Sequence, residues 1–233
     1  MKQLHERLRA LNSSAQSAPA PYRAEGSGSG SSVGKDRNNL ILASASPRRK
    51  KILGELGFVF DIVIPECEET RFEDDPHRTV SENATRKNNW CRERHPDAVI
   101  LSADTIVVFD NLIVEKPKSM DEAVSFLKMF SGNTQSVLTA VAVSSPQLNV
   151  IPSAAEGSNI SVEVIESIVH FKQLSDSMIE DYFTFVDPMD KAGAYDVDQY
   201  GDLVIESYEG PYSNIMGLPS DTAKDMLAKA GLE

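Results

Sequence analysis

The sequence predicts an α/β protein in which a mixed, twisted β-sheet is flanked by helices. Strand-like and helical segments alternate in the first half of the folded region, which is typical of parallel strands joined by helices. In the second half, long strand-like segments follow one another, which favours antiparallel pairing. A mixed sheet accommodates both patterns, so we expect it in preference to a purely doubly wound sheet.

Composition limits the function classes. The chain has 233 residues, 41% of them hydrophobic, enough for one large domain or two small lobes. Its net charge of -12 disfavours nucleic-acid partners, because these bind basic surfaces. Two cysteines, Cys67 and Cys91, do not make a disulfide scaffold or a zinc site. We see no membrane span or secretory signal and expect a cytoplasmic protein, with a mitochondrial address as the alternative.

Two regions differ in composition from the rest. Within residues 1–38, a short predicted helix over 2–11 runs into residues 13–34, which are rich in Ser, Gly, Ala and Pro. Such a composition buries too little surface to fold, so we expect a flexible N-terminal extension over 1–38. Residues 146–161 are polar and contain Pro and Gly, which predicts a surface loop. The folded domain is therefore expected over residues 39–233.

The first half of this domain has clear local signals. Leu40 to Ala43 reads as a buried strand. Ser46 as cap and Pro47 at the first helical position predict a helix that Gly57 ends. The following elements are predicted as a strand over 58–64, a helix over 80–93, a strand over 98–102, a hairpin with strands 104–109 and 112–115, and a helix over 120–130.

The second half is richer in strands. Long strands are predicted over 137–144 and 162–172. Ser175 is the expected cap of a helix reaching residue 185, with three apolar residues directed inward: Met178, Ile179 and Tyr182. A strand over 201–208 and a closing helix over 220–230 complete the prediction.

A basic helix start is the first candidate site. Ser44 and Ser46 are followed by four cations, Arg48 to Lys51. Cations in a first helical turn oppose the helix dipole unless an anion is bound there. Serine hydroxyls, free N–H groups and arginines together suit phosphate. The alternative, a solvated basic turn, is about equally supported by the residues alone.

Carboxylates and lysines form the other candidates. Asp104 follows a buried strand, so we expect its carboxylate at the sheet edge, where substrates and metals bind; a turn-forming aspartate is the alternative. Glu66, Glu68 and Glu69 offer oxygen ligands to Mg²⁺, although taken alone such a segment is more often a solvated acidic loop. Lys116 ends the hairpin, where a lysine taken alone is more often a surface residue. Asp190-Lys191 precedes small residues that would let a ligand approach the backbone; a tight loop between helix and strand is the alternative.

These segments together resemble the Maf family of nucleotide pyrophosphatases. The resemblance covers about residues 39–230 and keeps the order of the family's motifs, which are residues 40–49, 103–107, 116–117, 131–132, 190–195 and 212–219. It implies a Maf or inosine triphosphatase-like fold with two lobes around a cleft, often in a homodimer. It also implies Mg²⁺- or Mn²⁺-dependent hydrolysis of nucleoside triphosphates to the monophosphate and pyrophosphate.

The resemblance also assigns roles to residues. Asp104 looks like the general base that activates water, and Glu69 with Asp104 looks like the metal-binding pair. Lys87 looks like a further active-site cation. The expected catalytic group is thus Asp104, Lys87 and Lys116, and the expected substrate-binding group is Ser44, Arg48, Arg49 and Lys191.

One motif departs from the family pattern. Members that prefer dTTP and UTP usually have Gly-Ile-Gln-Gly after the tyrosine at position 195, whereas this chain has Asp196-Val197-Asp198-Gln199. The run still resembles the dTTP/UTP branch more closely than the branch acting on 7-methylguanosine triphosphate. That modified nucleotide, or another, is the alternative substrate. A non-catalytic nucleotide-sensing regulator of cell division is the alternative from another class.

Overall fold

A computed structural model describes residues 39–146 and 160–232. Seven strands form one sheet in the order β2-β1-β3-β5-β6-β7, and β4 pairs with the end of β3 that extends beyond β1. The strands are β1 (Leu40–Ala43), β2 (Asp61–Ile62), β3 (Val99–Phe109), β4 (Leu112–Val114), β5 (Thr134–Ser144), β6 (Ile160–Phe171) and β7 (Ile205–Glu209). The strand β1 runs parallel to β2 and β3, and the other pairs are antiparallel, so the predicted mixed sheet is confirmed.

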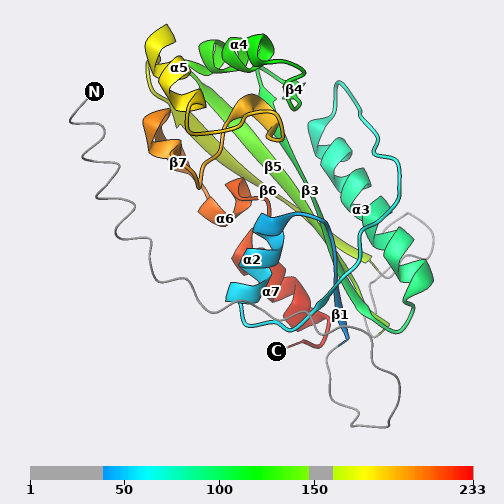
Figure 1. Ribbon diagram of the computed structural model, residues 1–233. Helices are drawn as coiled ribbons and strands as arrows, with labels where there is room; N and C mark the ends of the chain where they lie inside the picture. Colours follow the sequence, from blue (N-terminus) through cyan, green and yellow to red (C-terminus); the bar gives the residue numbers. More distant parts are fainter. Residues whose placement is uncertain (1–38, 147–159, 233) are drawn as a thin grey trace. The chain divides into compact units, whose positions relative to one another are not determined.

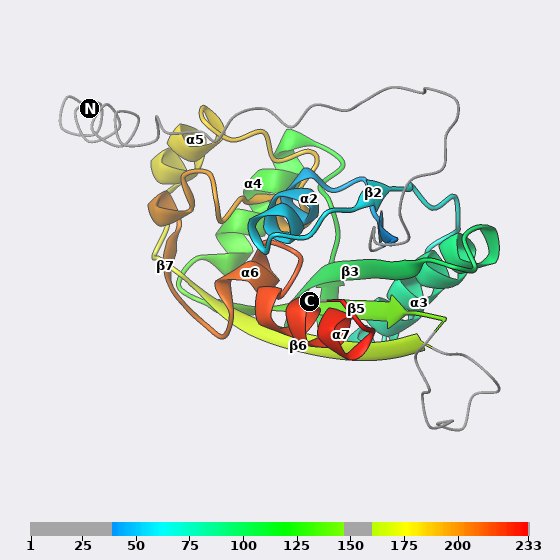
Figure 2. The same cartoon turned by 90° about the horizontal axis from the view of Figure 1, so that it is seen from below.

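Helices cover both faces of this sheet (Figure 1). They are α2 (Pro47–Glu55), α3 (Pro76–Arg94), α4 (Met120–Phe130), α5 (Asp176–Phe183), α6 (Tyr212–Ile215) and α7 (Ser220–Lys229), with 3-10 turns η1 (Ala192–Ala194) and η2 (Gly201–Leu203). The long strands β3, β5 and β6 lie side by side between the helices (Figure 2). The alternating side chains of β1 and β3 decide which helix packs on which face.

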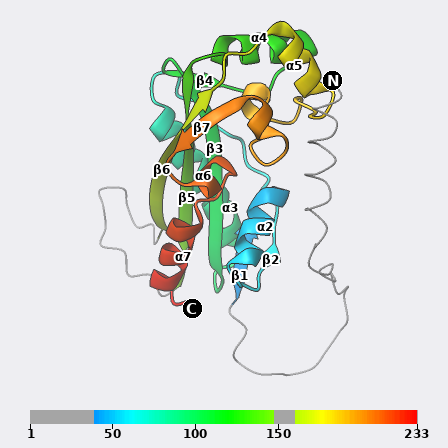
Figure 3. The ribbon, with the colours of Figure 1, turned by 90° about the vertical axis from the view of Figure 1, so that its left-hand side faces the viewer.

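Two core clusters share one face of the sheet. Leu42 and Leu101 pack with side chains of α2 and α7, whereas Val107 and Val137 pack further along with side chains of α4 and α5. Figure 3 shows these two helix groups at opposite ends of the long strands. On the other face, α3 packs against Ile100 through Cys91. The candidate site lies between the two clusters.

Local signals place the first elements correctly. The Ser46 Oγ accepts a hydrogen bond from the Arg49 N–H at 3.4 Å, and Pro47 begins the helix, as predicted. The predicted hairpin turns at Asp110 and Asn111, whose φ angles of 49° and 62° suit a tight turn. The predicted helix over 120–130 has the observed bounds of α4.

Other elements differ from the sequence prediction. The strand expected over 58–64 shortens to β2, because this edge segment pairs with β1 at two positions and exposes Val59 and Ile64. Met178 is 38% exposed, so its predicted inward orientation is wrong, whereas Ile179 and Tyr182 are buried as expected. Residues 201–203 form η2 before β7 begins.

Asp104 occupies an unexpected position in its strand. Instead of following a strand end, it lies within β3 and pairs with Ala140 of β5. The partner strand β5 continues along β3 from Ile100 to Val108, so no break follows Ser102. The carboxylate therefore projects from a fixed backbone, which restricts its position more tightly than a turn would.

Several expectations lie outside the described residues. These are the flexible extension over 1–38 and most of the loop over 146–161, so the domain boundary at residue 39 stays a prediction. Within the described ranges, no helix combines the length and apolar character needed to span a membrane.

Candidate active site

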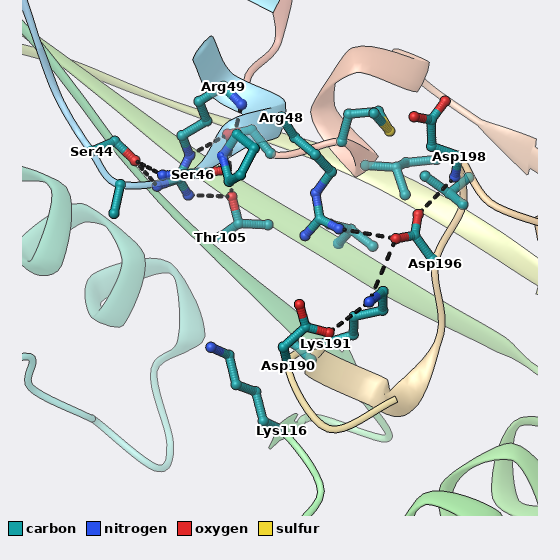
Figure 4. A pocket seen from close by; sticks show the side chains of 18 of the residues that line it. Ser44, Ser46, Arg48, Arg49, Thr105, Lys116, Asp190, Lys191, Asp196 and Asp198 are labelled. Atoms are coloured by element: carbon teal, nitrogen blue, oxygen red, sulfur yellow. Dashed lines mark hydrogen bonds and ion pairs between the residues drawn. The ribbon is translucent and has the colours of Figure 1, made fainter. Parts of the chain in front are cut away.

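A cavity of about 690 Å³ opens between the two core clusters. Its floor comes from Thr105 and Val107 of β3 and Val137 of β5. Around the floor lie the turn after β1, the start of α2, the segment that follows β4 and the segment 190–199 (Figure 4). Segments far apart in sequence thus contribute to one site.

A gap in strand pairing connects this cavity to the opposite face of the sheet. The strand β1 ends with Ala43 opposite Ser102, and β4 begins to pair with β3 at Val107. Between these points, one edge of β3 has no described strand beside it. Lys87 of α3 and Glu69 line the same cavity as Arg48, although α3 and α2 pack on opposite faces. The gap explains how groups from both faces reach one ligand.

The turn before α2 supplies hydroxyl groups and cations. Ser44 and Ser46 line the cavity, and the first turn of α2 contains no acidic residue. The Arg48 side chain extends from this turn into the cavity (Figure 4). Free N–H groups, the positive end of the helix dipole and a guanidinium together form a surface suited to phosphate.

Arg49 lines the cavity but is bound within the protein. Its Nε donates to the Gly217 carbonyl at 2.8 Å, and its Nη1 and Nη2 donate to Ser44 Oγ at 3.2 Å and Thr105 Oγ1 at 3.0 Å. Burial lowers the pKa of the guanidinium, while the charge of Asp104 opposes that change. These contacts tie α2 to β3 and to the turn after α6, so Arg49 shapes the cavity wall.

We expect Arg49→Ala to destabilise the domain by about 2–3 kcal/mol. Hydrogen bonds from charged groups contribute about 1.5–3 kcal/mol each, but the three acceptor oxygens that Arg49 leaves would bind water in part, so the total loss is smaller than the sum. For a domain of this size, the midpoint of thermal unfolding should fall by about 5–10 °C. Lys51→Ala removes an exposed cation of the same helix, which pairs with Asp198 at 3.6 Å, and serves as the control. An Arg49→Ala protein as stable as Lys51→Ala would contradict this assignment.

Two carboxylates share one lysine at the other side of the cavity. Lys87 Nζ lies 2.6 Å from Asp104 Oδ1 and 2.6 Å from Glu69 Oε1. Burial alone would raise the pKa of Glu69, but its hydrogen bond to Lys87 and the charges of Lys87, Arg49 and Lys116 lower it overall. The lysine thus holds two anions close together, the buried Asp104 and the more exposed Glu69.

Asn83 is a site residue that the sequence analysis missed. Its Nδ2 donates to Asp104 Oδ2 at 3.3 Å and to the Thr70 carbonyl at 3.1 Å, while its Oδ1 accepts from the Thr70 N–H at 2.8 Å. It therefore fixes the segment that carries Glu69 relative to Asp104. Its spacing of four residues from Lys87 on α3 is the signal that would have identified it.

The carboxylate pair suits a hard divalent cation. No group of three or more metal-ligating side chains occurs within residues 39–146 and 160–232. Mg²⁺, however, is commonly held by one or two carboxylates, with waters and substrate phosphates completing its coordination. Glu69 and Asp104 supply such a pair beside the phosphate-binding surface, so the residues present fit the ion when a polyphosphate accompanies it.

Lys116 and Lys191 bring two more ammonium groups to the cavity. Lys116 has no hydrogen-bond or ion-pair partner among the described residues, and its ammonium faces the open centre in Figure 4. Lys191 Nζ is held by Asp190 Oδ1 at 2.6 Å and by the Asp187 carbonyl at 3.0 Å. The small residue Gly193, expected to admit a ligand, instead packs against the Phe130 and Tyr195 rings.

The structure therefore brings the predicted site residues together around one cavity. Those that line it are Ser44, Arg48, Arg49, Glu69, Lys87, Lys116 and Lys191. Asp104 lies directly behind the lining, bonded to Lys87 and adjacent to Thr105. Asp196, which the sequence analysis noted as a departure but did not assign, joins Arg48 to Lys191.

Fold and site together define an α/β protein with a cationic cavity and a carboxylate pair, an arrangement suited to a polyphosphate. A family model described as Maf-like protein matches residues 39–230, so this chain belongs to the Maf family.

Known relatives span nearly the same region. The chain is 39% identical to a dTTP/UTP pyrophosphatase of Clostridioides difficile, over 82% of this chain and 94% of the relative. It is 37% identical to a dTTP/UTP pyrophosphatase of Dictyoglomus turgidum, over 84% of this chain and 97% of the relative. Among solved structures, the Staphylococcus aureus Ham1 protein matches 82% of this chain and 98% of its own, with 14% identity and a TM-score of 0.43.

Proposed function

We propose that this protein hydrolyses nucleoside triphosphates to the monophosphate and pyrophosphate, with a preference for dTTP and UTP. The observation that carries the proposal is one cavity lined by Arg48, Lys116, Lys191 and Glu69. Asp104 lies directly behind this lining and shares Lys87 with Glu69. The names of the relatives support the same reaction and the same bases.

In this mechanism, the cations bind the triphosphate. Arg48 and the serine turn before α2 contact phosphate oxygens from one wall, and Lys116 and Lys191 contact them from the opposite wall. These groups neutralise the charge that repels an attacking water, and they stabilise the charge that develops on the departing pyrophosphate. Because the sheet fixes the walls, this stabilisation needs little rearrangement during the reaction.

Asp104 acts as the general base. Its carboxylate is held through Oδ1 by Lys87 at 2.6 Å and through Oδ2 by Asn83 at 3.3 Å, with lone pairs left on both oxygens. It accepts a proton from water as the water oxygen attacks the α-phosphorus, and the bond to the bridging oxygen of the pyrophosphate breaks. No covalent intermediate with the protein forms.

Glu69 and Asp104 would hold the divalent cation, and Lys87 holds the two carboxylates close together. When bound, Mg²⁺ or Mn²⁺ supplies Lewis-acid stabilisation of the phosphate oxygens. Lys87 must then yield some of its contact with Glu69, whose exposed side chain has room to turn.

A triphosphate panel tests the reaction and the base preference together. We expect pyrophosphate release, measured as phosphate after added inorganic pyrophosphatase, to be fastest with dTTP and UTP. Faster hydrolysis of 7-methylguanosine triphosphate would place the enzyme in the other branch. Nucleotide binding without any pyrophosphate release would instead identify a sensor.

Arg48→Ala should raise KM for UTP by about tenfold or more and lower kcat as well, because a charge-assisted contact to phosphate is worth about 1.5–3 kcal/mol. Steady-state kinetics with UTP provide the measurement. Lys51→Ala, in the next turn of α2 and outside the cavity lining, is the matched control. If the kinetic constants of Arg48→Ala equalled those of Lys51→Ala, Arg48 would have no role in phosphate binding.

A further inference from the structure

Asp196 is the acidic residue of the cavity lining that lies between Arg48 and Lys191. The Asp196 side chain is 6% exposed, and its Oδ2 lies 3.3 Å from Arg48 Nη1 and 3.9 Å from Lys191 Nζ. Both cations line the cavity and converge on this carboxylate in Figure 4. A carboxylate at this position pairs with Arg48 and Lys191, the same two cations that would bind a substrate phosphate.

The backbone holds this carboxylate in place. Its Oδ1 accepts hydrogen bonds from the N–H groups of Asp198 at 2.9 Å and Gln199 at 3.3 Å. The Asp196 N–H donates to Tyr182 Oη at 2.9 Å, and Tyr182 is a fully buried residue of α5. The carboxylate therefore cannot turn away when a phosphate enters.

The two cations depend on Asp196 to different degrees. Lys191 is also held by Asp190 and by the Asp187 carbonyl, so it keeps its position without Asp196. For Arg48, Asp196 is the sole hydrogen-bond or ion-pair partner that the described part of the chain provides. Asp196 thus directs Arg48 across the cavity toward Lys191.

We propose that Asp196 is a positioning residue that acts as an internal counter-anion. It directs Arg48 before substrate binds, and its negative charge then repels the bound phosphates. This repulsion lowers the affinity of Arg48 and Lys191 for a polyphosphate and favours release of the pyrophosphate product. The inference rests on the proposed function. It makes Asp196 the residue that sets the balance between tight binding of the triphosphate and release of pyrophosphate.

Asp196→Asn separates the charge from the structural role. An asparagine oxygen can still accept from the Asp198 and Gln199 N–H groups, so the loop is retained while the charge is lost. With Lys191 still held, loss of repulsion outweighs looser placement of Arg48. We expect the Kd for inorganic pyrophosphate to fall by about threefold to tenfold, because like charges a few ångströms apart disfavour binding strongly at a partly buried site.

Titration calorimetry with inorganic pyrophosphate measures this affinity. Asp202→Asn makes the same charge change at an exposed position outside the cavity lining, and its affinity should match that of the unaltered protein. If Asp196→Asn does not fold, as judged by circular dichroism, Asp196→Ser offers a neutral hydroxyl acceptor for the same N–H groups. Equal or weaker pyrophosphate binding in the folded neutral variant would overturn the proposal, since a purely structural role cannot tighten binding.

Kinetics provide a second readout. In Asp196→Asn, KM for UTP and kcat should fall together, because tighter binding of the phosphates slows product release. A rise in KM would contradict the counter-anion role. Pyrophosphate binding can be measured without turnover. If the unaltered protein hydrolysed no triphosphate, the proposed function would be rejected, but the comparison of pyrophosphate affinities would still test the role of Asp196.

Discussion

Asp104→Asn is expected to lower kcat by about 10²–10⁴-fold, the usual contribution of a general base. The substitution keeps the size and planarity of the side chain, and its one amide oxygen can still accept from Lys87 or from Asn83, but that oxygen is too weak a base to accept the proton of water. KM for UTP should change much less, because Arg48, Lys116 and Lys191 still bind the phosphates. Rapid-quench or steady-state measurement of pyrophosphate release gives the comparison.

Asp110→Asn is the matched control for this variant. It makes the same chemical change one residue beyond the end of β3, at the hairpin tip, where φ is 49° and asparagine is well tolerated. Its kcat should equal that of the unaltered protein. An Asp104→Asn protein with a normal unfolding transition and undiminished kcat would remove Asp104 from the mechanism.

The sequence predicts those elements whose determinants are local. Ser46, Pro47 and Gly57 mark the start and end of α2 because capping, φ restriction and positive φ act within one turn of the helix. The hairpin at residues 110 and 111 is equally local. Each of these predictions is confirmed because no distant contact overrides the local preference.

Distant pairing explains the errors. The prediction that Asp104 follows a strand end is wrong: a polar residue interrupts an apolar run there, yet β5 pairs along the whole of this region and keeps β3 continuous. The same limit applies to the site. Asp196 lies 148 residues from Arg48 in sequence, and only the folded sheet brings the two together. The type of a residue indicates what chemistry its side chain can perform, whereas the side chains that it contacts depend on the topology of the fold.

Removal of divalent cations should reduce activity by at least about 10²-fold, because the metal's contribution amounts to several kcal/mol of charge stabilisation in such sites. A chelator in the assay, followed by addition of Mg²⁺ or Mn²⁺, measures the loss and its recovery. Two carboxylates alone make a weak site, so Mn²⁺ should bind tightly only when a non-hydrolysable triphosphate analogue is present. Electron paramagnetic resonance of Mn²⁺ distinguishes the free ion from the bound ion.

Glu69→Gln links this metal requirement to a residue. We expect the variant to need a several-fold higher Mg²⁺ concentration for half-maximal activity, since one of the two charged ligands is lost. Because Lys87 lowers the pKa of Glu69, the carboxylate stays charged below the pH at which a free glutamate gains its proton, so the difference between the variant and the unaltered protein should persist in mildly acidic buffer. Glu68→Gln changes the adjacent exposed carboxylate and should leave the Mg²⁺ requirement unchanged. An equal rise in the required Mg²⁺ concentration in both variants would show that the acidic segment acts through its overall charge. Full activity of the unaltered protein in the presence of chelator would show that the reaction needs no metal.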